Sequence, residues 1–170
     1  MTGDIEAVRR VVARERGLAV VTTLRADASM QASVVNAGVV AHPLTGEQVV
    51  GFVAIGGTVK LCHLRRRPRT TVVFRVGGGW VSVEGTASLL GPDDIVDSFE
   101  LANLPALVRE VYLSTGATHD DWPTFDRVMA DERRCVVLVH PERIYGSGVS
   151  APITMVPLRP ATEPSPRGIR

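Results

Sequence analysis

Alternation of apolar and polar residues is the strongest pattern in this chain. It is clearest in residues 80–90, where apolar and polar side chains alternate along the sequence. The apolar set, which we expect on the buried face, is Val81, Val83, Ala87 and Leu89. A period of two is that of a strand with one buried face. Similar β-branched runs bounded by turn residues predict further strands at 18–24, 30–40, 48–55, 70–76 and 135–146.

The connections between these runs decide the predicted fold class. They are short and rich in glycine and proline, as in residues 42–46 and in the triple glycine 77–79. Short connections suit antiparallel hairpins, whereas parallel strands need crossovers of a dozen residues or more. We therefore expect a mainly β protein, with about six antiparallel strands in a barrel and helices at its periphery.

Two of the expected helices lie in the first half of the chain. Residues 4–16 carry Ile5, Val8 and Val12 at helical spacing and stop at Gly17. Residues 59–67 form a second, short helix that begins after Gly56-Gly57-Thr58 and is closed by Pro68. Both predictions follow from periodicity and from the residues that end a helix.

Two more helices are expected between the fifth and sixth strands. The first opens at residues 91–94, carries Ile95 and Phe99, is interrupted at Pro105 and resumes to about Tyr112. The second begins near Asp121, and its inward side is expected to hold Phe125, Val128 and Met129.

No internal repeat divides the chain, so we expect one domain over residues 1–150. The last 20 residues, 151–170, hold five of the eleven prolines and are expected to form an extended tail.

Composition narrows the class of protein. The formal net charge is +1, which argues against a nucleic-acid binder driven by bulk charge. No apolar run approaches the roughly 20 residues that cross a bilayer, and the N-terminal residues lack a signal-peptide core. Cys62, Cys135 and four dispersed histidines show neither disulfide nor metal-ligand spacing. We expect a cytoplasmic protein without a metal site, bound to neither membrane nor nucleic acid.

Three motifs that would indicate other chemistry are incomplete. Gly51 and Gly56 have the spacing of a phosphate loop, but Gly57 stands where that motif needs its lysine. The triple glycine 77–79 precedes a strand and not a helix, so we interpret it as a hairpin turn and not as a dinucleotide-binding motif. Ser147 lacks the nucleophile-elbow pattern. Hydrolase chemistry therefore has no support in the sequence.

The segment from Gly57 to Arg69 is the one remaining candidate site. A glycine-led turn into a helix presents backbone N–H groups and the positive end of the helix dipole to an anion. Thr58 adds a hydroxyl and Lys60 a mobile cation, and all other basic residues of the chain are arginines. The alternative is a solvated basic helix face with no ligand.

Several segments resemble the split-barrel family of pyridoxamine-phosphate-oxidase-like flavoproteins, especially the actinobacterial branch that uses the deazaflavin coenzyme F420. They are LAVVTTLRAD, QASVVN, TVKLCHLRRRPR, GWVSVEGTASLL and DDWPTFDRVMADERRCVVLVHPERIYG. The resemblance covers roughly residues 5–148. It implies a split β-barrel that binds FMN or F420.

The resemblance also implies a set of cofactor-binding residues. The family's phosphate-binding pattern is matched at Lys60, Leu64, Arg65, Pro68 and Arg69. Thr58 replaces the family's first arginine, His63 its asparagine and Arg67 its usual acid. The complete implied set is Ser33, Val34, Val35, Asn36, Gly57, Thr58, Lys60, His63, Arg65 and Trp80.

Some members of this set can also be interpreted as purely structural residues that bind no cofactor. Ser33 and Asn36 can equally be the polar face of a strand. Trp80 can equally be a core side chain beside a hairpin.

The function implied is hydride transfer from reduced F420 to a small organic acceptor. The cluster Arg65–Arg67 suits the anionic polyglutamate tail of that cofactor. Alternatives are an FMN-dependent oxidase or reductase of the same fold, and a non-enzymatic protein that binds a flavin-like ligand. Pyridoxamine-phosphate oxidase itself is disfavoured, because the ending SPRGIR lacks the Arg-Leu-Ala-Pro of those enzymes. No side chain stands out as a catalytic acid or base, and a homodimer with cofactor sites at its interface is expected.

Overall fold

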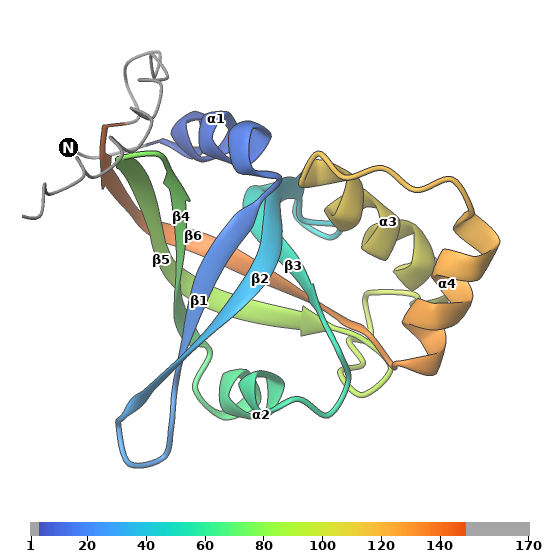
Figure 1. Cartoon of the computed structure of the whole chain (residues 1–170). Coiled ribbons are helices and arrows are strands. Elements are labelled where there is room, and N and C mark those ends of the chain that lie inside the picture. Colours follow the sequence, from blue (N-terminus) through green and yellow to red (C-terminus); the bar gives the residue numbers. More distant parts are fainter. Residues whose placement is uncertain (1–3, 149–170) are drawn as a thin grey trace, which may run out of the picture.

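The computed structural model describes residues 4–148, so the expected tail at 151–170 lies outside the described residues. Six strands and four α-helices follow one another along these described residues (Figure 1). The strands are β1 (Leu18–Leu24), β2 (Met30–Ala41), β3 (Gln48–Ala54), β4 (Arg69–Val76), β5 (Gly79–Leu90) and β6 (Cys135–Ser147). The helices are α1 (Ile5–Glu15), α2 (Val59–Arg66), α3 (Leu104–Ser114) and α4 (Trp122–Asp131), with a 3₁₀ turn at Leu101–Asn103.

All six strands form one closed antiparallel barrel in the order β1-β2-β3-β6-β5-β4. The expectation of a mainly β barrel with six antiparallel strands and peripheral helices is confirmed. Register between β5 and β6 shifts once, at Glu84/Gly85. An added Cβ at Gly85 would lie 1.9 Å from the carbonyl oxygen of His140, so only glycine fits the bulge.

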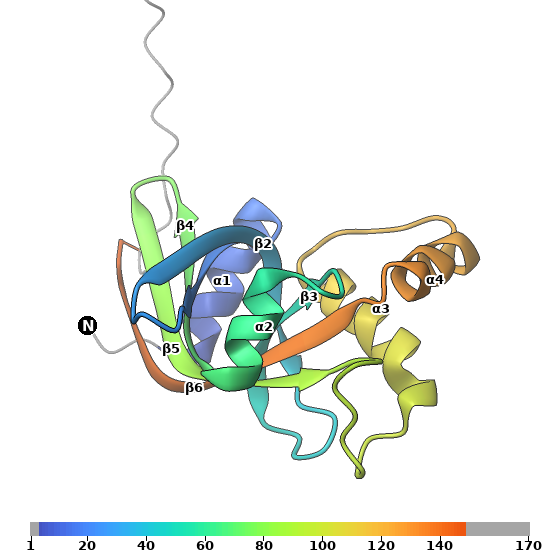
Figure 2. The same ribbon diagram turned by 90° about the horizontal axis from the view of Figure 1, so that it is seen from below.

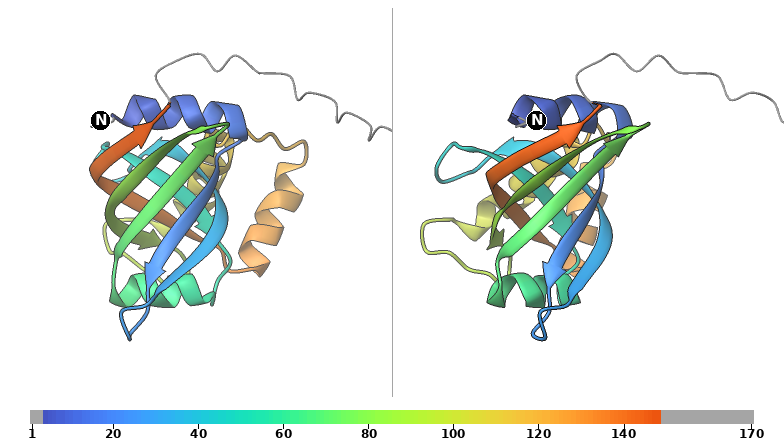
Figure 3. Two further views of the ribbon diagram at one scale, coloured as in Figure 1. Left: turned by 60° about the vertical axis from the view of Figure 1, so that its left-hand side comes forward. Right: turned by 90° about the vertical axis from the view of Figure 1, so that its left-hand side faces the viewer.

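Side chains that alternate inward fill the barrel, and two helices close its ends. The inner cluster is mostly valine, with Phe52 and Phe74 as its largest members. Figure 3 shows α1 across one end of the barrel and α2 across the other. The amphipathic α1 buries Val8 and Val11, and α2 buries Leu61 and Leu64. Each fully buried side chain of this kind contributes roughly 1.5–3 kcal/mol.

A second, smaller core lies outside the barrel, where α3 and α4 pack beside β3 and β6 (Figures 1 and 2). Leu107, Val108 and Val111 of α3 and Phe125 of α4 are its buried helical members. This layer gives one side of the barrel a helical cover.

The predicted helix over residues 91–99 is wrong. Residues 91–100 form turns and an isolated bridge between Gly91 and Asp94. Pro105 lies in the first turn of α3 instead of interrupting a longer helix, because its missing N–H is harmless there.

The predicted inward side of α4 is wrong at one position. Phe125 is buried and Met129 packs against the second core outside the barrel, called the outer core below, but Val128 is 40% exposed. With only one buried residue, the apolar stripe of this helix is narrower than its sequence suggests.

Two imidazoles and a hydroxyl lie together on the outside of β5 and β6. His42 is buried, and its Nδ1 accepts a hydrogen bond from the backbone N–H of Leu44 at 3.3 Å. Its Nε2 lies 3.4 Å from Ser88 Oγ, which lies 3.3 Å from Nε2 of His140. Burial and the neighbouring His140 lower the pKa of His42, while Glu47 opposes that shift.

We expect the free energy of unfolding to fall as the pH drops below about 6.5, the ordinary histidine pKa. A lowered pKa in the folded state means that the unfolded chain binds more protons in this range, so acid favours unfolding. Urea titrations at about pH 7.5 and about pH 5.5 test this, and His42→Gln should flatten the dependence. An equally steep dependence in His42→Gln would assign the effect to other groups.

Candidate functional site

The ladder between β2 and β3 covers only part of β2. It joins only Ala37–Ala41 to Gln48–Phe52, although β2 begins at Met30. Residues 30–36 of β2 pair with β1 alone. One edge of this segment therefore has no ladder partner among residues 4–148, and its backbone N–H and C=O groups are available to a ligand.

The four residues expected to line a cofactor ring lie on this segment, but on two faces. Ser33 and Val35 alternate toward the barrel interior, where Val35 packs against the core. Val34 is 66% exposed, and Asn36 is exposed beside it. The amide Nδ2 of Asn36 donates to the carbonyl oxygen of Arg16 at 3.0 Å. Because successive strand residues point to opposite faces, only Val34 and Asn36 can offer side chains to a ligand outside the barrel.

The turn into α2 has the geometry of an anion site. Gly57 adopts a φ of +72°, and an added Cβ there would meet no atom within 4 Å, so the space beside it is open. The Thr58 hydroxyl donates to the carbonyl oxygen of Ile55 at 2.9 Å and does not cap the helix. Within the described chain, the backbone N–H groups of Val59 and Lys60 have no acceptor, and the first turn carries no acid.

Lys60 and His63 play different roles on α2. The half-buried Lys60 makes no ion pair or hydrogen bond with residues 4–148, so its ammonium is available to a ligand. His63 Nδ1 lies 3.0 Å from the hydroxyl of the buried Thr23 on β1, which fixes α2 to the end of the barrel.

Arg65 is engaged within the protein. Its Nε and one terminal nitrogen donate to the two carboxylate oxygens of Asp94 at 2.7 and 2.8 Å. The guanidinium holds the pKa of Asp94 below its ordinary value, against the effect of burial. The thiol of Cys135 also donates to Asp94, at 3.4 Å, and burial raises the pKa of that thiol. Asp94 thereby joins α2 to the start of β6.

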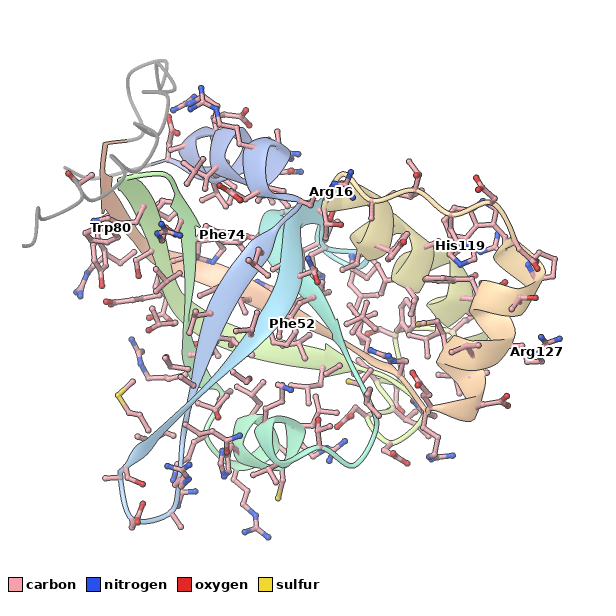
Figure 4. The ribbon with its side chains drawn as sticks, viewed as in Figure 1. Arg16, Phe52, Phe74, Trp80, His119 and Arg127 are labelled. Atoms are coloured by element: carbon pink, nitrogen blue, oxygen red, sulfur yellow. The ribbon has the colours of Figure 1, made fainter. Side chains whose placement is uncertain are left out.

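Trp80 lies apart from the other expected site residues. It begins β5 at the end of the barrel near α1, whereas α2 closes the opposite end (Figures 1 and 4). It is 37% exposed and packs edge-on against Tyr145, with ring centroids 5.8 Å apart. Within one chain, Trp80 and the turn into α2 cannot contact the same small ligand.

A cavity of about 410 Å³ adjoins the open edge of β2, and sequence reasoning missed it. It lies where β2 and β3 diverge, between these strands and the helices α3 and α4. Of the expected site residues, Asn36 lines it. The other lining residues come from five separate segments: Arg16, Val53, Val111, Tyr112, Thr115, Ala117, Phe125, Met129 and Arg134.

One backbone hydrogen bond joins the start of the turn into α2 to the segment 132–134, which ends at the cavity-lining Arg134. The N–H of Gly56 donates to the carbonyl oxygen of Glu132 at 3.0 Å. An added Cβ at Gly56 would lie 2.6 Å from the carbonyl oxygen of Arg133, so a larger residue would push the two segments apart. The pair Gly56-Gly57 was the available sequence signal for this approach.

The described residues bring no three His, Cys, Asp or Glu side chains together in a way that could hold a metal ion. Among the helices of residues 4–148, none combines the length and apolar character that a membrane span requires.

No model of a protein family and no curated protein sequence matches the chain. Several solved structures, however, are similar to the structure of this chain. A protein of unknown function from Agrobacterium tumefaciens str. C58 aligns with a TM-score of 0.56 at 18% identity, over 87% of this chain and 57% of that one. The chain thus spans little more than half of that relative.

Two further structures carry functional descriptions. A pyridoxamine 5'-phosphate oxidase-related, FMN binding protein from Nostoc punctiforme PCC 73102 aligns with a TM-score of 0.59 at 12% identity, over 83% of this chain and 79% of its own. An F420 reductase aligns with a TM-score of 0.53 at 12% identity, over 79% and 93%.

The fold is therefore the split barrel found in flavin- and deazaflavin-related proteins, as the sequence resemblance implied. At these identities the likeness is one of fold, which many different activities can share.

Proposed function

We propose that this protein is an oxidoreductase that transfers a hydride from reduced F420 to a small organic acceptor, with FMN as the alternative cofactor. One observation carries the proposal. The turn into α2 offers unpaired backbone N–H groups and the ammonium of Lys60, and α2 closes the end of the barrel where the segment of β2 without a second ladder partner begins (Figure 3). A cofactor with a phosphate at one end and a flat ring at the other matches this pair of features.

The residues of the chain bind and orient the cofactor. The N–H groups of Val59 and Lys60 would hold the phosphate, with Lys60 as the charged side-chain ligand. Val34 and the open edge of β2 would support the ring. The cofactor, when bound, supplies the hydride. We assign no catalytic residue among residues 4–148.

The choice of F420 rests on charge at the end of α2. Arg65 is neutralised by Asp94, but Arg66 and Arg67 make no ion pair with the described residues. These two cations lie at the opposite end of α2 from the phosphate site, and they favour a cofactor whose anionic tail extends beyond its phosphate, which F420 has and FMN lacks.

The outer face of the barrel supports a homodimer. Leu18, Val20, Val34, Val73 and Trp80 form a surface over β2, β1, β4 and β5, which we call the outer apolar face. Val34, Val20 and Val73 lie in one row across three strands. Exposed apolar surface of this kind indicates an interaction site, and two-fold pairing is the commonest way to bury it. Val34 belongs both to the outer apolar face and to the residues proposed to support the cofactor ring. The proposed cofactor site would therefore lie at the dimer interface.

Lys60→Ala should weaken cofactor binding by about 10- to 150-fold, since a charge-assisted hydrogen bond is worth roughly 1.5–3 kcal/mol. Fluorescence quenching of FMN and of F420 on titration with full-length apo-protein measures the dissociation constants. Arg10→Ala, on the exposed side of α1, is the matched control and should bind as the wild type does. An unchanged constant in Lys60→Ala would place the phosphate elsewhere.

The same titration compares the two cofactors. Tighter binding of FMN than of F420 by tenfold or more would overturn the choice of F420. Binding of either cofactor without turnover of any acceptor would favour the non-enzymatic alternative.

Thr58→Arg should tighten cofactor binding, because it adds a guanidinium at the first turn of α2. The replaced hydroxyl donates only to the carbonyl oxygen of Ile55, so it is not needed by the ligand. Weaker binding by Thr58→Arg would show that this hydroxyl holds the turn in its binding conformation.

A further inference from the structure

We infer that the cavity between β2–β3 and α3–α4 binds the acceptor, and that the acceptor is a planar organic anion of one or two fused rings. The inference rests on the proposed function, whose substrate class it names. Nothing in the fold comparison assigns a ligand to this cavity. Its volume of about 410 Å³ is within the range of small-molecule sites, roughly 300–1,000 Å³.

The apolar part of the lining fits a flat ring. Val53 comes from β3, Val111 from α3, and Phe125 and Met129 from α4. Val111 and Phe125 belong to the buried outer core, so this wall is rigid. The ring of Tyr112 packs against Phe125 with centroids 4.9 Å apart, which adds a second aromatic surface. Aromatic and aliphatic walls of this kind take up planar apolar groups.

The charged part of the lining is entirely positive. Arg16 and Arg134 line the cavity, and no acidic residue does. Arg134 is already paired with Glu132, at 2.6 Å. The side chain of Arg16 makes no hydrogen bond or ion pair within residues 4–148, so its charge is available to a ligand. A cavity with one uncompensated guanidinium selects a carboxylate or phenolate over a neutral ring.

The backbone of Arg16 is held firmly even though its side chain has no partner. It ends α1 in the left-handed region, with a φ of 50°, and its carbonyl oxygen accepts from Asn36. Figure 4 shows Arg16 between α1 and the C-terminal end of α3. A non-glycine residue at positive φ is uncommon, and a glycine or asparagine there would be less strained.

The position of the cavity suits an acceptor. Asn36 belongs both to the cavity lining and to the β2 segment whose edge is open. A ring in the cavity would therefore lie beside a cofactor ring held at that edge. Reduction of a conjugated acceptor takes a hydride from the reduced cofactor and one proton from water, so no further reactant is needed.

The test uses full-length apo-protein with 2-naphthoate as the anionic probe and 2-naphthamide as a neutral probe of the same shape. Calorimetric titration should show saturable binding of 2-naphthoate, at least about tenfold tighter than of 2-naphthamide. Arg16→Asn, which tolerates the positive φ, should remove that preference while leaving 2-naphthamide binding unchanged. Arg16→Lys should retain part of it, and Arg14→Asn, which changes a residue outside the cavity, should retain all of it.

A second variant tests the location. Ala117→Trp, in the connection between α3 and α4, should fill the cavity and abolish binding of both probes. Equal affinity for the two probes, or a preference that survives Arg16→Asn, would overturn the inference. Cofactor binding separates failure of this inference from failure of the proposed function. Lys60→Ala should weaken cofactor binding and leave 2-naphthoate binding unchanged. Arg16→Asn should weaken 2-naphthoate binding and leave cofactor binding unchanged.

Discussion

Val20→Asp is expected to convert the protein from the proposed dimer to a monomer. Val20 lies at the centre of the outer apolar face, with Val34 on one neighbouring strand and Val73 on the other. It is 39% exposed in the single chain and would be covered by the partner. A two-fold dimer would bury the new carboxylate twice, and an unpaired buried charge costs several kcal/mol. A loss of about 3 kcal/mol or more raises the dissociation constant at least about 100-fold.

Size-exclusion chromatography with light scattering measures this change. The wild type should have about twice the chain mass of 18.2 kDa at micromolar concentration, and Val20→Asp should have the chain mass. Ile95→Asp is the matched control, because Ile95 is exposed in the turn region between β5 and α3 and not on the outer apolar face. A wild type that is already monomeric would disprove the shared interface. The cofactor titrations would still test cofactor binding by the single chain.

Asp94→Ala is expected to lower the free energy of unfolding by about 2–3 kcal/mol. The carboxylate is only 11% exposed, and its loss leaves Arg65 without its bidentate partner. Breaking a fully buried ion pair costs roughly 3–5 kcal/mol, and the figure is reduced here because Arg65 is one-third exposed. For a chain of this length, such a loss lowers the melting temperature by roughly 5–10 °C.

The neighbouring carboxylate provides the control. Asp93 pairs with Arg133 on the surface, where an ion pair is worth about 0–1 kcal/mol, so Asp93→Ala should change stability little. Equal effects of the two substitutions would show that the Arg65–Asp94 pair is not a special link between α2 and β6. If Arg65→Ala also loses stability but retains cofactor affinity, Arg65 acts by holding α2 and not by binding phosphate.

Part of the candidate site could be predicted because its signals are local. Gly57, Thr58 and Lys60 are close in sequence, and a glycine-led turn into a helix determines how they are presented. The strand that carries residues 33–36 was also predicted, but its four residues were treated as one surface. The period of two places Ser33 and Val35 inside and Val34 and Asn36 outside, which alternation alone could have indicated.

The partner of Arg65 could not be predicted. Asp94 is 29 residues away along the chain and lies in a segment that was expected to be helical. The cavity was equally hidden, because its lining comes from residues between Arg16 and Arg134 whose proximity depends on how α3 and α4 pack against the barrel. Contacts of this kind arise only when distant segments fold together.

The sequence by itself determined the six strands, the antiparallel class and the turn into α2, because side-chain periodicity and turn residues act over a few positions. Only the tertiary structure decided where the β2–β3 ladder ends, which cations remain unpaired, and that a cavity with one uncompensated guanidinium adjoins the open strand edge. These features depend on packing between elements far apart in the chain, and no local pattern encodes the distances involved.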